Sequence, residues 1–177
     1  MSGEEAVVLS DYLVGVIVRD LKALGREVEA YPDDASLWRT PPGVANSGGT
    51  LALHLCGNVQ HFFGAILGGT GYVRDRAAEF SRRDVPRSEL VAQVNAAVAA
   101  AERGLAQVSD ASLATDFPEA IAGHTVATGE WLIHLAVHLG YHLGQIDYHR
   151  RLVTGRGDTV GTLAVPQLRT ARKGDVA

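Results

Sequence analysis

The chain has 177 residues, enough for one domain with its own hydrophobic core. Apolar residues make up 46%, charged residues 20%, and the net charge is -4, which is typical of a globular protein. The arginines are dispersed, so no basic stripe marks a nucleic-acid partner. Apolar runs fall far short of the ~20 residues that span a bilayer, so we expect no membrane association.

The compartment follows from the cysteine content and from the first residues of the chain. Cys56 is the only cysteine, so no internal disulfide can form. The start, MSGEEAVVLS, lacks the basic residues and the apolar run of a secretory signal. We therefore expect a cytoplasmic protein.

Helical spacing of apolar residues predicts a first helix from Glu4 to about Ala30. Two proline-containing segments, YPDD and RTPPG, then break the pattern, and Trp38 between them is expected to anchor the bundle end. Asn46 or Ser47 can cap a second helix. That helix is expected to end at Gly68-Gly69.

The second half of the chain predicts two more long helices. A polar stretch, residues 72–87, is expected to be a loop, and a third helix follows Pro86, with an apolar stripe that ends at Val108. A fourth helix is predicted from an N-cap at Thr128 to about Val153, where Thr154-Gly155 ends it. Without an alternating strand pattern, we predict an all-α four-helix bundle domain over residues 1–155. Residues 156–177 would be a C-terminal extension, either draped over the bundle or mobile.

Most of the histidines lie on one face of the predicted fourth helix. His134, His138 and His142 follow one another at four-residue intervals, and at about 100° per residue they fall within roughly 80° of arc. Histidines one turn apart can reach the same cation. His134 and His142 are two turns apart, about 12 Å, which is too far for two bonds of ~2.1 Å to one ion. One outer histidine must therefore have another role.

A further ligand would have to come from a facing helix. In the second helix His54, Asn58 and His61 share a face, but His54 and His61 are two turns apart and are not expected to share an ion. Cys56 points about 200° away from His54 and is expected to be a small buried hydrophobe. The alternative is that all these histidines are packing residues, but each buried imidazole without a polar partner would cost about 1–3 kcal/mol.

The reverse face of the fourth helix carries Gly140 and Gly144. Glycines four residues apart let another backbone come close, although each costs about 1 kcal/mol in a helix. This spacing predicts a helix packed on two sides, including within an oligomer.

The segments HLCGNVQHFF and HLGYHLGQI resemble the DinB/YfiT-like family of damage-inducible bundle proteins, and the resemblance extends from about Val7 to Gly155. The segments WRTPPGVANSGG, RDRAAEF and YHRRLVTG resemble a branch of unknown function. The resemblance implies an up-down-down-up four-helix bundle, often a homodimer. It also implies a divalent metal site formed by His54, His138 and His142.

One position departs from the family pattern. Arg-Gly-Gln usually follows the second histidine of the pair, whereas here Leu143 precedes Gly144-Gln145. The change affects no ligand, but it removes a cation that could orient a substrate. His61, His134 and His149 then lie outside the ligand set, with roles left open.

Three imidazoles suit zinc best, while nickel, iron and manganese stay open. They also leave a coordination position free, as in catalytic sites. Gln145 and Asn58 are candidates to orient the ligands. A carboxylate base is harder to find, because Asp147 should point away from the site. Glu79 could enter the site from its loop, but we favour a solvated ion pair with Arg74 or Arg76.

These features favour a metal-dependent enzyme acting on a small molecule, with no catalytic residue identified beyond the metal ligands. The resemblance implies use of low-molecular-weight thiols such as bacillithiol, mycothiol or glutathione, in a transferase or isomerase. A hydrolase is a second reaction class. The alternatives are a non-catalytic metal-binding stress-response bundle and a purely structural bundle.

Overall fold

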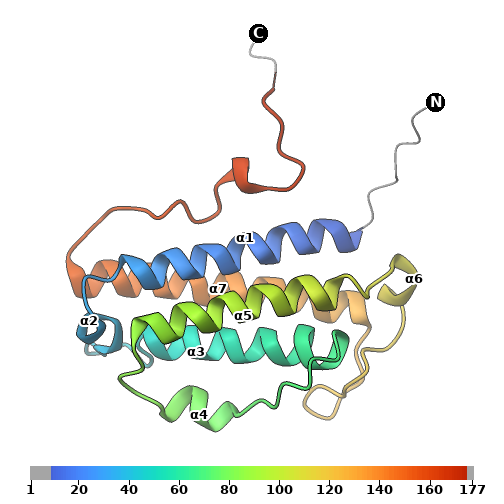
Figure 1. Ribbon diagram of the computed structural model, residues 1–177, viewed down its shortest axis with the longest axis horizontal. Coiled ribbons are helices and arrows are strands. Elements are labelled where there is room, and N and C mark those ends of the chain that lie inside the picture. Colours follow the sequence, from blue (N-terminus) through green and yellow to red (C-terminus); the bar gives the residue numbers. More distant parts are fainter. Residues whose placement is uncertain (1–8, 175–177) are drawn as a thin grey trace.

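Four long helices form the body of the protein in the computed structural model, which describes residues 9–174. They are α1 (Leu9–Ala30), α3 (Gly48–Val59, continued by the π-helix η1, Gln60–Leu67), α5 (Arg87–Leu105) and α7 (Thr128–Thr154). Both α1 and α3 pack against α5 and α7. In Figure 1, α3 and α5 run in one direction while α1 and α7 run in the other. The all-α prediction is confirmed for the described residues, which contain helices and no strand.

The core forms because each long helix turns one apolar stripe inward. Ile17, Leu21 and Leu24 of α1 are completely buried. Burial of such a side chain contributes about 1.5–3 kcal/mol. The stripe of small residues on α5 lets η1 come close to this helix, since a side chain at Gly104 would clash with the backbone of Phe63. The Ala-rich helix therefore packs tightly on η1.

Several short helices lie in segments where no helix is predicted from the sequence. Helix α2 (Asp34–Trp38) begins at Asp33, whose side chain accepts a hydrogen bond from the Ser36 backbone N–H at 2.7 Å. Its last residue, Trp38, is buried and donates from Nε1 to the Val85 carbonyl at 3.0 Å, as expected of an anchor. Helix α4 (Arg76–Ser81) lies in the supposed loop 72–87 and is capped by Asp75. That prediction is wrong because a helix of six residues can form from a cap without an apolar stripe.

Some helix ends agree with the prediction and others differ from it. As predicted, Ser47 caps α3, accepting from the Thr50 N–H at 3.1 Å, and Gly155 ends α7 with a left-handed φ of 69°. In contrast, helix α5 ends at Leu105 rather than Val108. Thr128 is the first residue of α7 and not its cap, because the extended residue before the helix is Ala127, whose side chain cannot accept a hydrogen bond. The predicted start of the first helix, residues 4–8, lies outside the described residues.

Between α5 and α7 the chain makes an irregular connection. It contains the single-turn helix α6 (Asp110–Leu113) and two isolated bridges, Asp116 with Ala127 and Ile121 with His124. Phe117 of this connection is buried against Phe62 and Trp131. The connection therefore closes one end of the bundle.

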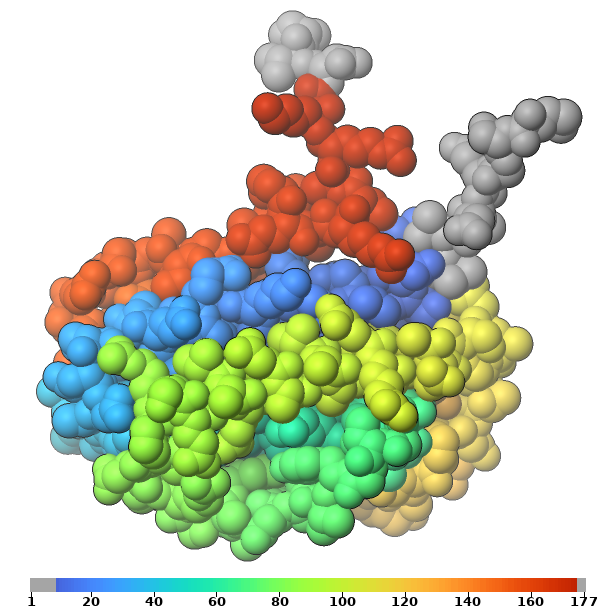
Figure 2. Space-filling view, in the orientation of Figure 1, coloured from blue at the N-terminus to red at the C-terminus, as the bar shows by residue number. Residues whose placement is uncertain are grey.

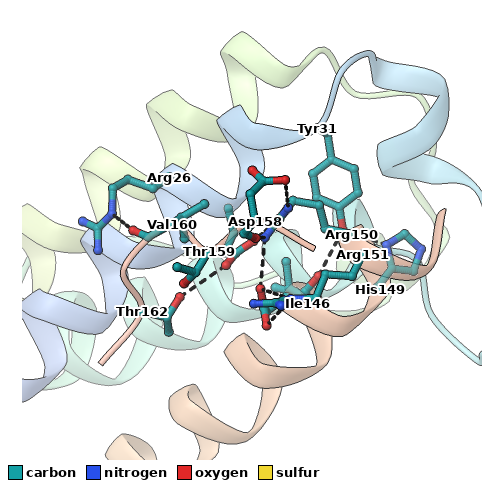
Figure 3. Close-up of polar contacts among 12 residues, drawn as sticks. Arg26, Tyr31, Ile146, His149, Arg150, Arg151, Asp158, Thr159, Val160 and Thr162 are labelled. Carbon is teal, nitrogen blue, oxygen red and sulfur yellow. Dashed lines mark hydrogen bonds and ion pairs between the residues drawn. The ribbon is translucent and has the colours of Figure 1, made fainter. Parts of the chain in front are cut away.

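The segment after Gly155 turns back and lies along α1, as Figures 1 and 2 show, and includes a short 3-10 helix, η2 (Val165–Gln167). Figure 3 shows its main contacts: the Arg26 side chain donates to the Val160 carbonyl at 2.9 Å, and Arg150 donates to the Asp158 carbonyl at 2.7 Å. Of the two expectations for this extension, the structure shows the draped form. The division of the chain at residue 155 stays a prediction.

No helix of the described chain has an apolar stretch that could cross a bilayer.

Candidate metal centre

Three histidines from two helices converge between α3 and α7. His54 of α3 and His138 and His142 of α7 each offer one ring nitrogen, and these three atoms lie within 4.8 Å of one another. The Nε2 atoms of His54 and His138 are 3.2 Å apart. Two nitrogens on one tetrahedral ion with bonds of ~2.1 Å would be roughly 3.4 Å apart. The spacing of the rings therefore fits a single small cation.

His54 is oriented by a buried ion pair behind it. Its Nδ1 lies 2.9 Å from Oε2 of Glu79, and Arg74 donates two hydrogen bonds to the same carboxylate, at 2.7 and 2.9 Å. Because a carboxylate only accepts hydrogen bonds, the proton of His54 belongs on Nδ1. The lone pair on Nε2 then faces the other two histidines, which is the arrangement that a metal ligand requires.

Glu79 is closer to the site than the sequence predicted. Its side chain is only 6% exposed, so the expected solvated ion pair is in fact a buried one. Burial would raise its pKa, but the hydrogen bonds from Arg74 and His54 outweigh burial and lower the pKa instead. The carboxylate is therefore ionised and engaged. Gly57, one turn after His54, provides the space, because any side chain there would overlap Glu79.

His142 is held in the matching tautomer by a residue of its own helix. Its Nδ1 lies 2.7 Å from Oε1 of Gln145 and donates to it, so Nε2 is left free. Gln145 thus occupies the orienting position expected for it. Asn58 is buried but, within residues 9–174, makes no hydrogen bond to these histidines.

His138 packs against both other rings, with centroids 5.1 Å from His54 and 4.6 Å from His142, and its pKa is the most strongly shifted of the three. Burial lowers its pKa to about 4, helped by the charges that His142, His54 and His134 would carry. Burial likewise lowers the pKa of His142. Nδ1 of His138 is buried and has no hydrogen-bond partner in the described chain. At neutral pH the rings of His138 and His142 are uncharged, as metal binding requires.

The other candidate residues are engaged elsewhere. His134 is exposed and stacks on Trp131 with ring centroids 4.8 Å apart, and Nε2 of His61 lies 3.0 Å from Glu119. Asp147 points away from the site, as predicted, and pairs with Arg150 and Arg151. Burial raises the pKa of Cys56 to about 12, so its thiol stays protonated.

Two residues support the site in ways that the sequence did not predict: Arg74, which was expected only in a solvated ion pair with Glu79, and Gly57. The signal for Arg74 was its spacing from Glu79 within RDRAAEF, which places a cation five residues before a carboxylate. Gly57 carried no signal, because its role depends on a segment that packs on α3 from elsewhere in the chain.

Comparison with known proteins identifies the family of the chain. The family model of the DinB superfamily matches residues 18–146, well over half of the chain and including all three clustered histidines. Among curated proteins, none matches the sequence.

Proposed function

The chain belongs to the DinB superfamily, and on this premise we propose that His54, His138 and His142 bind one divalent metal ion in an enzyme acting on a small molecule. The observation that carries the proposal is the convergence of three imidazoles that no other histidine, cysteine or carboxylate joins within residues 9–174. Three protein ligands leave a coordination position for a substrate. Zinc fits this ligand set best, with nickel, iron and manganese as alternatives. The helix directions in Figure 1 also support the up-down-down-up topology implied by the resemblance.

The residues present fit such an ion. Glu79 and Gln145 each accept a hydrogen bond from Nδ1 of a ligand ring, which directs the Nε2 lone pairs of His54 and His142 into the cluster. The lowered pKa of His138 keeps its ring neutral. The ion would supply Lewis acidity toward a thiol or water of the reaction.

The state of Glu79 favours a thiol over water as the nucleophile. Its carboxylate is occupied by Arg74 and His54, so it is not free to take a proton from water. A thiol has a pKa near 8.5, whereas that of water is about 15.7, so a thiol requires much less activation. We therefore favour a transferase or isomerase that uses a low-molecular-weight thiol, in a reducing cytoplasm where such thiols stay reduced. A hydrolase is the second candidate.

Metal analysis of untagged protein tests the site itself. We expect about one equivalent of a divalent transition metal after growth in metal-replete medium, and its loss in His138→Ala with the fold retained. His134→Ala is the matched control, because it removes an exposed imidazole of the same helix. Less than about 0.2 equivalents in the wild-type protein would overturn the metal site.

A conjugation assay tests the reaction. Metal-loaded protein is mixed with an electrophilic haloarene and bacillithiol, mycothiol or glutathione, and thioether formation is followed by absorbance. We expect a rate that depends on metal and is absent in His138→Ala. Inactivity with every thiol and with ester substrates would favour the non-catalytic alternative, in which metal removal lowers the melting temperature without loss of any reaction.

A second copy of the chain is the partner that we propose. On α7, Ile133, Val137 and Tyr141 are exposed by 49%, 66% and 63%. Beside them, side chains added at Gly140 or Gly144 would meet no other atom within 4 Å, so these glycines leave room for the helix of another copy. An uncharged face of this kind is self-complementary in a two-fold dimer.

Ultracentrifugation tests the dimer. We expect Val137→Lys to produce monomers and Val73→Lys, at a site exposed by 87%, to leave dimers intact. A monomeric wild-type protein would refute the dimer.

A further inference from the structure

A cavity of about 490 Å³ lies next to the three histidines, and Gln145, the hydrogen-bond partner of His142, is part of its lining. It lies between the loop 43–46 and the C-terminal half of α7. On its walls, Leu51 is one turn before His54 in α3, and Gln145 is one turn after His142 in α7. Because α3 and α7 run in opposite directions (Figure 1), both displacements lead toward the same end of the bundle. Gln145 belongs to both places, since it also holds His142.

The cavity is apolar and uncharged. Val44, Leu51, Tyr148 and Leu152 form much of its lining, and no aspartate, glutamate, lysine or arginine is part of it. Its one titratable imidazole, His149, has a pKa lowered by burial and is neutral at pH 7. The volume falls within the range of about 300–1,000 Å³ that is usual for small-molecule sites.

A second cavity of similar size shows that the lack of charged side chains is not common to all cavities of this protein. About 430 Å³ of space between α1 and the C-terminal segment is lined by four cationic side chains, Arg19, Lys22, Arg26 and Arg169, and by one carboxylate, Glu102. The lining of that cavity is therefore charged. The cavity beside the histidines offers no charged partner and therefore favours an uncharged group.

We propose that this cavity binds an uncharged, apolar tail of the substrate whose reacting heteroatom lies at the three histidines. The inference rests on the proposed function and adds the class of substrate to it. Gln145 and Tyr148 are three and six residues beyond His142, which is about 5–9 Å along the helix. The substrate is therefore elongated, with a metal-binding head, a spacer of that length and a tail that enters the cavity.

A series of unbranched alkyl hydroxamates tests this inference, because the hydroxamate head binds divalent metals and only the tail varies. Dissociation constants are measured by calorimetry on the metal-loaded protein. We expect the shortest member to bind, and the affinity to rise about fourfold per methylene once the tail reaches the cavity. The rise should stop when the cavity is full.

Two variants locate the tail. Ala45→Trp fills the cavity from its exposed loop, and Leu152→Asp places a charge on a wall that is 61% exposed, so neither disturbs the core. Both should abolish the gain with chain length and leave the shortest hydroxamate unaffected. Ala92→Trp, at an exposed position of α5, is the control and should retain the gain. Val137→Lys should also retain it, which would show that the cavity works within one copy.

The outcomes separate the two proposals. If the shortest hydroxamate fails to bind metal-loaded protein, the proposed function is wrong. If it binds but longer tails bring no gain, the cavity does not hold the tail. A gain that survives in both Ala45→Trp and Leu152→Asp, or that disappears in monomeric Val137→Lys, also overturns the inference.

Discussion

Helix α7 carries histidines in two regions whose surroundings differ sharply. Near its C-terminal end, Nδ1 of His149 lies 2.7 Å from the Tyr31 hydroxyl and Nε2 lies 2.8 Å from the Arg39 carbonyl. In the middle of the helix, His138 has one nitrogen without a partner and the other directed at His54. The first ring is fully satisfied by the fold, whereas the second is not. A histidine therefore stabilises the fold at position 149, whereas the histidine at position 138 is available to bind a ligand.

The region around His149, at the C-terminal end of α7, also contains a buried ion pair. Arg150 and Glu27 are both fully buried, with Nε and Oε2 2.6 Å apart, and Arg150 also holds the C-terminal segment through the Asp158 carbonyl (Figure 3). The region of the three clustered histidines instead depends on Glu79 and Gln145, which orient the rings of His54 and His142. Substitutions near His149 should therefore lower the free energy of unfolding, and substitutions near the cluster should weaken metal binding.

The largest expected effect is on stability. Arg150→Met leaves the Glu27 carboxylate buried without a counter-charge, which should cost about 3–5 kcal/mol in the free energy of unfolding, measured by urea denaturation. Arg151→Met, whose partial exposure weakens its pair with Asp147, should cost at most about 1 kcal/mol. Folded Arg150→Met should still bind metal. A loss of metal from the folded variant would contradict the separation of the two regions.

The next effect is on metal affinity. Glu79→Gln removes the anionic acceptor behind His54 and should weaken metal binding about 10–100-fold, measured by competition with a chelator. Gly57→Ala should act in the same direction, because its methyl group would displace Glu79. Glu89→Gln, which breaks the exposed pair with Arg82, is the control. Unchanged affinity in Glu79→Gln would show that the carboxylate does not orient the ligand.

A smaller effect is expected at the satisfied histidine. Tyr31→Phe removes the hydroxyl bound to Nδ1 of His149 and leaves that nitrogen buried without a partner, at a cost of about 1–2 kcal/mol in the free energy of unfolding. Tyr148→Phe, at a side chain exposed by 77%, should change stability little. Metal content should be the same in both variants. If Tyr31→Phe lost metal, His149 would belong to the site.

An effect of similar size is expected as a pH dependence of the metal-free protein. The pKa of His138 is lowered from its ordinary 6.5 to about 4, so between these values the unfolded chain binds the proton and the folded chain does not. The free energy of unfolding should therefore decrease as pH falls from about 6.5 to about 4, by about 1–2 kcal/mol after allowance for solvent screening. His138→Gln should make this decrease shallower. An unchanged slope in that variant would assign the decrease to other groups.

Much of the helical frame could be predicted because its signals are local. The apolar period of α1, the cap at Ser47 and the glycine after α7 are properties of neighbouring residues, and the structure confirms each of them. Helix α4 could not be predicted this way, because it is short and turns a carboxylate rather than an apolar stripe inward. The burial of Glu79 depends on Arg74, His54 and the space over Gly57, which meet only in the folded chain.

The sequence by itself determined the four long helices and the face of α7 on which the histidines lie, because helical periodicity follows from local geometry. It left two overlapping histidine pairs on that face, and only a family resemblance separated them. Tertiary packing decides between them in the structure, since the register of α3 against α7 brings His54 to 3.2 Å from His138 while His134 stacks on Trp131. That register depends on the packing of side chains from distant parts of the chain, which no local spacing records.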